Sequence, residues 1–178
     1  ERSREIITYW GDAHRQWRKS YRDGALYREE RWNAEGRRVY ERWGGRVALT
    51  EYPEPNHWVE TTRKGDLIVR RERVWTNDDG RITRQLIEHE SGHYETLQTW
   101  NGALLVERRH EDQDGWSAYR ARYDDGRLVW SEWKGSEVET RTDTLEYDSE
   151  GRLTRQTRAH PDGPYWEVVY DYSRCSAL

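Results

Sequence analysis

Histidines and carboxylates are the side chains in this sequence that are most able to bind a metal or catalyse a reaction. His89 and His93 flank Gly92, so a hairpin turn there would bring two imidazoles together. A zinc site needs three or four well-placed ligands. The other histidines are scattered without ligand spacing, at His14, His57, His110 and His160. We therefore expect no metal site and no cofactor.

Two acidic segments place carboxylates just before a glycine, as calcium loops do. They are DQDG, which ends at Gly115, and NDDG, which ends at Gly80. The bidentate glutamate that completes a calcium loop is missing from the required spacing. Asp and Asn also favour tight turns through hydrogen bonds to their own backbone, and we interpret both segments as hairpin turns.

Carboxylate pairs also serve glycoside hydrolysis, which needs two of them at a defined separation in a cleft. The chain has 34 acidic residues, so no pair can be singled out. No nucleophile elbow, phosphate-binding loop or Cys/His arrangement is present. We expect no catalytic residues and no enzyme, with a hydrolase-type activity as the alternative.

The charge pattern bears on partners and location. Thirty basic residues offset the acids to a net charge of −4, and the two signs alternate locally without forming a basic stripe. Basic segments such as 70–73 are explained by cross-strand charge pairs, so we expect no nucleic-acid partner. No apolar run approaches the roughly 18 residues of a membrane span. The single Cys175 cannot form an internal disulfide, and the chain begins without Met, so any signal peptide would lie outside this sequence.

The fold must position these groups with few aliphatic residues. Eleven Trp and twelve Tyr accompany a complete absence of Phe and Met, which predicts a thin, amphipathic aromatic core. Period-two runs of β-branched and aromatic residues predict strands, for example at 38–43, 67–75, 102–108 and 165–172. Turns are expected near Gly11, Gly24, Gly36, Gly44-Gly45, Pro53-Glu54-Pro55, Gly65, Gly80, Gly92, Gly102, Gly115, Gly126, Gly135, Gly151 and Gly163.

This spacing predicts an all-β fold of about fifteen short strands in a repetitive antiparallel hairpin meander. The sheet is expected to be open and curled or a partial barrel, with a closed ligand-binding barrel as the alternative. We expect one domain over residues 1–178, with a frayed tail at about 173–178.

Four turns share an aromatic residue, polar residues, Gly-Arg and an apolar residue. They begin at Trp32, Trp75, Tyr123 and Tyr147. Successive turns of a meander alternate between the two edges of the sheet. Counting the expected turns along the chain assigns all four to the same edge. We therefore expect them along one rim, at a repeat of roughly one hairpin.

The segment YDSEGRL at 147–153 closely resembles the core of the tyrosine–aspartate (YD/RHS) repeats of bacterial surface proteins. The turn at Tyr123 departs by one deleted residue, and the turns at Trp32 and Trp75 replace Tyr with Trp. The resemblance implies long β-hairpin sheets that enclose a toxin or present binding surfaces, and it supplies no catalytic residues. The matched positions are interpreted as structural turn residues: Gly36, Gly80, Gly126, Gly151, Asp124, Asp148, Arg127 and Arg152.

These observations predict a non-catalytic protein-binding or surface-binding module. It would be an immunity-type partner of a toxin, or a fragment of a secreted polymorphic-toxin assembly, at the cell surface or outside the cell. A glycan-binding protein and a designed β-protein are the alternatives. Aromatic residues beside the expected rim are the candidate partner-binding residues: Trp10, Trp32, Trp75, Trp100, Tyr123 and Tyr147.

Overall fold

The computed structural model describes residues 3–11, 14–136, 139–161 and 165–172. It divides the chain into two compact units, residues 1–93 and 94–178. The prediction of a single domain stays a prediction, and the expected tail at 173–178 and turn near Gly163 lie outside the described residues. No helix in the described part of the chain is long and apolar enough to cross a membrane.

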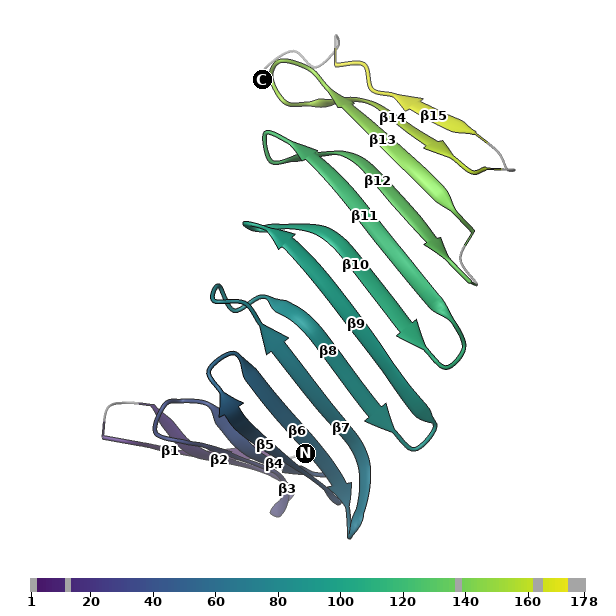
Figure 1. The fold of residues 1–178 in the computed structure, drawn as a ribbon. Helices are drawn as coiled ribbons and strands as arrows, with labels where there is room; N and C mark the ends of the chain where they lie inside the picture. The colour runs from purple at the N-terminus through teal and green to yellow at the C-terminus, as the bar shows by residue number, and fades with distance from the viewer. Residues whose placement is uncertain (1–2, 12–13, 137–138, 162–164, 173–178) are drawn as a thin grey trace. The chain divides into compact units, whose positions relative to one another are not determined.

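The first unit is an antiparallel meander in which each strand pairs with the next (Figure 1). Its strands are β1 (Ser3–Tyr9), β2 (Arg15–Arg22), β3 (Ala25–Trp32), β4 (Arg38–Trp43), β5 (Arg46–Glu54), β6 (His57–Lys64), β7 (Leu67–Thr76) and β8 (Ile82–His89). Strand β9 (Gly92–Asn101) begins in this unit and continues into the second.

The second unit repeats the arrangement, starting from the part of β9 that pairs with β10. Its further strands are β10 (Leu104–Asp112), β11 (Trp116–Asp124), β12 (Arg127–Gly135), β13 (Arg141–Tyr147), β14 (Leu153–Ala159) and β15 (Trp166–Val169). The all-β hairpin meander expected from the glycine spacing is therefore confirmed. The alternative of a closed barrel is wrong, because the described strands follow one linear order that never returns to its first strand.

Within each unit, the two patterned turns lie at one edge of the meander, as predicted. In the first unit, the turns at Trp32 and Trp75 join β3 to β4 and β7 to β8, so they lie at the same edge of the meander. In the second unit, the turns at Tyr123 and Tyr147 join β11 to β12 and β13 to β14, again at one edge.

The interior differs from the aromatic core that the composition suggests. Among the residues that the structure describes, the buried apolar side chains are Ala48, Val74, Ile87 and Ala121, and ten further buried residues are polar or charged. The described Trp and Tyr rings are half-buried or exposed. A single sheet has no second layer to cover a large ring, so only short side chains and well-paired acids in the strand centres are fully enclosed.

Candidate functional site

Three of the four patterned turns share one hydrogen-bonded geometry. An Asn or Asp follows Trp32 and Tyr147 directly, and Trp75 after one intervening residue. Its side-chain oxygen accepts the backbone N–H four positions later, at 2.9 Å in Asn33, Asn77 and Asp148. The glycine three positions on has a left-handed backbone, with φ of 74° at Gly36, 77° at Gly80 and 82° at Gly151. Glycine adopts this region without strain, which explains its place in each turn.

The turn at Tyr123 is built differently. Asp124 pairs directly with Arg127 across a two-residue loop, in which Asp125 and Gly126 both have positive φ, 45° and 76°. Two positive φ values define the tight hairpin turn that matches the twist of the flanking strands. The deletion of one residue relative to the segment at 147–153 therefore changes the turn type and keeps the hairpin.

Tyrosines at this edge tie each hairpin to the preceding one in the second unit. The hydroxyl of Tyr123 donates to the Leu105 carbonyl at 3.1 Å, and Tyr147 and Tyr172 each donate to a carbonyl of the previous hairpin at 3.0 Å. Arg127 lies 6.0 Å from the Tyr147 ring centre, and Arg152 lies 5.1 Å from that of Tyr172. These turn arginines therefore stack on the tyrosine of the following hairpin.

Gly151 completes this ladder because it leaves room for the arginine of the preceding hairpin. A Cβ atom at this position would collide with the guanidinium of Arg127. Asp148 in the same turn accepts from the backbone and the guanidinium of Arg152, and these bonds lower the pKa of its carboxyl below its usual value. In the segment that resembles a YD repeat, Tyr, Asp, Gly and Arg thus all contact the chain's own turns.

The six aromatic residues expected to contact a partner lie in different environments. Trp10 is exposed, at 37% of its surface. Trp75 is stacked on His57, with ring centres 4.6 Å apart, and Arg84 lies over the ring at 4.7 Å. Trp32, Trp100, Tyr123 and Tyr147 are half-buried. The structure therefore leaves Trp10 accessible, whereas the Trp75 ring and the Tyr123 and Tyr147 hydroxyls are engaged inside the protein.

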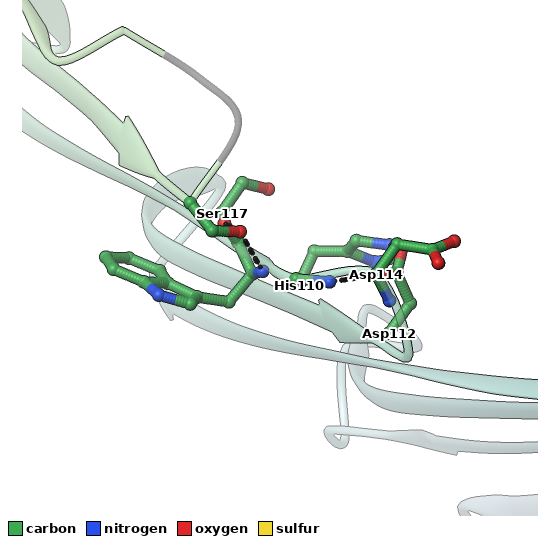
Figure 2. A pocket seen from close by; sticks show the side chains of 7 residues that line it. His110, Asp112, Asp114 and Ser117 are labelled. Carbon is green, nitrogen blue, oxygen red and sulfur yellow. Dashed lines mark hydrogen bonds and ion pairs between the residues drawn. The ribbon is translucent and has the colours of Figure 1, made fainter.

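A small pocket in the second unit gathers groups that the sequence did not connect (Figure 2). Thr96 Oγ1 lies 2.9 Å from Nδ1 of His110, and Nε2 of the same ring lies 3.4 Å from Asp112. Backbone donation from Asp114, together with smaller contributions from Gly115 and His110, lowers the pKa of Asp112. Strand register produces this cluster, since Thr96 and His110 are cross-strand partners 14 positions apart.

Hydroxyl, imidazole and carboxylate in this order are the components of an acyl-transfer triad. The Thr96 side chain is only 8% exposed, so its hydroxyl cannot approach a substrate carbonyl. The second oxygen of Asp112 accepts from the backbone N–H groups of Asp114 and Gly115 at 2.9 Å, which makes this segment a turn. The arrangement orients a histidine and provides no exposed nucleophile.

One face of the first unit carries an internally paired charge network. We call it the glutamate face, and it includes Glu30, Glu41, Glu60 and Glu72, which register places on the same side of the sheet as Ala48 and Thr62. Arg38 lies 2.5 Å from Glu41 and 3.1 Å from Glu60, and Arg28 lies 2.8 Å from Glu41. Such pairing is required because an unpaired buried carboxylate is costly.

The opposite side of the first unit, which we call the arginine face, is defined by Leu49, Val59, Arg63, Arg71 and Arg73. These residues line a shallow pocket of about 250 Å³. Among the described residues, Arg63 and Arg71 have no ion-pair partner. Glu88 lies opposite Arg71 in the register but pairs with Arg73 at 3.3 Å. Leu49 is 44% exposed beside them.

Comparisons with known proteins leave these surfaces as the basis for interpretation. No protein-family model matches the chain, and no curated protein sequence matches it.

Spacing alone did not indicate the arginine face, because the side that each strand residue faces depends on β-bulges, such as the one between Thr62 and Arg63. The useful sequence signal was the local excess of arginine in segment 70–73.

Proposed function

We propose that this chain is a non-catalytic binding module whose arginine face binds an acidic segment of a protein partner. One observation carries the proposal. Arg63 and Arg71 have no acid partner in the described structure, whereas Arg28 and Arg38 on the glutamate face are paired with glutamates. Guanidinium groups beside exposed aliphatic carbon are typical of protein-binding surfaces, where Arg is enriched.

The shape of the surface also supports a protein partner. The pocket of about 250 Å³ is shallow, and Leu49 and Val59 form its apolar part between the arginines. An extended acidic segment could place carboxylates on Arg63 and Arg71 while its apolar side chains cover Leu49. Bidentate guanidinium–carboxylate bonds would fix its register.

The partner class follows from the resemblance of segment 147–153 to YD/RHS repeats. In this proposal the chain is an immunity-type partner of a toxin, or part of a secreted toxin assembly at the cell surface. The Tyr and Arg of that segment then maintain the hairpin stack, while the arginine face makes the contact.

The test is affinity capture with a charge-reversed variant, followed by binding measurements on the purified candidate. Arg63→Glu with Arg71→Glu is expected to abolish capture of a protein that the wild-type chain retains, and to weaken its purified complex at least tenfold. The matched control is Arg109→Glu with Arg120→Glu, which makes the same charge change at exposed positions of the second unit. A partner that binds both variants equally would refute the proposal, and so would turnover of a substrate by the chain in place of stable binding.

A further inference from the structure

The glutamate face of the first unit contains a hollow of about 840 Å³ near the turns that join β4 to β5 and β6 to β7. Trp43, Arg46, Lys64 and Leu67 form a continuous row along it. Register places Trp43 opposite Arg46, Arg46 opposite Lys64, and Lys64 opposite Leu67. Four neighbouring strands therefore contribute one indole, two cations and one aliphatic side chain to the same side of the hollow.

Arg46 and Lys64 are an unfavourable pair in the isolated chain. Like charges directly opposite each other on one face of an antiparallel pair destabilise the sheet. Neither side chain has an ion-pair partner among the described residues, whereas Arg38 on the same face contacts both Glu41 and Glu60. A bound anion between the two cations would convert the repulsion into attraction.

The remaining lining narrows the chemistry of that anion. Trp43 is half-buried beside Arg46, and an indole face packs against the C–H face of a sugar ring. Glu41 and Glu60 also line the hollow, but both carboxylates are already paired with Arg38 and leave the charges of Arg46 and Lys64 without a partner. Ala48 lies between Glu41 and Thr62 in the register and is only 1% exposed, so a methyl group separates these two side chains.

We propose that this hollow binds an acidic sugar, with its carboxylate between Arg46 and Lys64 and its ring against Trp43. This site is separate from the arginine face, because it lies on the opposite side of the sheet and uses other residues. It adds a carbohydrate ligand to a chain that is proposed above to bind protein.

The experiment is calorimetric titration of the chain with three probes: a galacturonic acid trisaccharide, the neutral galactose trisaccharide and inorganic phosphate. The acidic trisaccharide is expected to bind at least tenfold more tightly than either of the others. Lys64→Gln is expected to weaken its binding at least tenfold, and Trp43→Leu to weaken it severalfold without changing the affinity for phosphate.

The matched control is Arg42→Gln, which removes an exposed cation next to Trp43 on the opposite face of the sheet. This variant is expected to bind the acidic trisaccharide like the wild-type chain. Circular dichroism of all variants checks that the strands remain formed. The proposal is overturned if the acidic trisaccharide does not bind, if phosphate binds equally well, or if Arg42→Gln weakens binding as much as Lys64→Gln.

Discussion

Arg38 on the glutamate face of the first unit and Arg63 and Arg71 on its arginine face lie in opposite electrostatic surroundings. On the glutamate face, Arg38 contacts Glu41 and Glu60, whose side chains are 12% and 13% exposed. On the arginine face, Arg63 and Arg71 line a pocket together with the exposed Leu49. Neither arginine has an ion-pair partner among the described residues. The first arrangement stabilises the sheet, and the second leaves charge available to another molecule. Arg38 therefore has a structural role on the glutamate face, whereas Arg63 and Arg71 have a proposed binding role on the arginine face.

The largest expected effect is the loss of Arg38. Arg38→Ala would leave the Glu41 and Glu60 carboxylates with fewer partners at low exposure, and we expect it to lower the free energy of unfolding by about 2–3 kcal/mol. Arg71→Ala on the arginine face is expected to change it by less than about 0.5 kcal/mol. Urea denaturation of the two variants measures the difference, and equal losses would contradict the contrast between the faces.

The turn edge of the second unit extends the comparison to another internally satisfied region. Gly151→Ala would force a side chain into left-handed backbone, at a cost of about 1–2 kcal/mol, and would also displace Arg127 from Tyr147. Gly80→Ala meets the same backbone strain in the first unit with no neighbour within 4 Å of the new Cβ. We expect Gly151→Ala to lower the melting temperature more than Gly80→Ala. The reverse order would argue against the tyrosine–arginine ladder.

The pH dependence of the free energy of unfolding tests the same turn, with a smaller expected effect. Backbone and guanidinium donation from Arg152 lowers the pKa of Asp148 below its usual 3.8 in the folded chain. A lowered folded pKa stabilises the fold above the unfolded pKa, and this contribution is lost as the pH falls through the folded value. Asp148→Asn keeps the turn geometry seen at Asn33 and Asn77 but cannot titrate. Its stability should therefore fall less than that of the wild type between neutral pH and pH values below 3.8, as measured by chemical denaturation at each pH.

The smallest expected effect is at the like-charged pair. Lys64→Gln removes the repulsion with Arg46 and is expected to raise the free energy of unfolding by about 0.3 kcal/mol in the absence of an anion. Arg63→Gln on the opposite face has no such repulsion to relieve. A loss of stability in Lys64→Gln, measured by urea denaturation in low-salt buffer, would show that Lys64 has a favourable partner in solution.

Local chemistry made the fold predictable to a large extent. A glycine with positive φ, three positions after an Asn or Asp, determines the turns at Gly36, Gly80 and Gly151. Alternation between turns gives the meander. Strand β4 matches the expected segment 38–43, and β7 extends the expected 67–75 by one residue. Strand β15 is shorter than the segment 165–172, and beyond its end the Tyr172 hydroxyl donates to the Leu153 carbonyl.

The sites were less predictable because they depend on register. The bulge between Thr62 and Arg63 shifts the pairing of β6 with β7 from Arg70 to Ile68. A one-residue shift exchanges the faces of all residues beyond it, so sequence spacing cannot tell which arginine meets a glutamate. The aromatic rim residues illustrate the same limit, since His57 reaches Trp75 and Arg127 reaches Tyr147 from the preceding hairpin.

The most direct test of the central claim compares arginine side-chain resonances during titration with a short poly-glutamate peptide at low salt. We expect the Nε–Hε signals of Arg63 and Arg71 to shift together and saturably, while that of Arg38 stays in place. Shifts spread evenly over the exposed arginines of both units, or the absence of any shift at Arg63 and Arg71, would contradict the assignment of the arginine face as a binding surface.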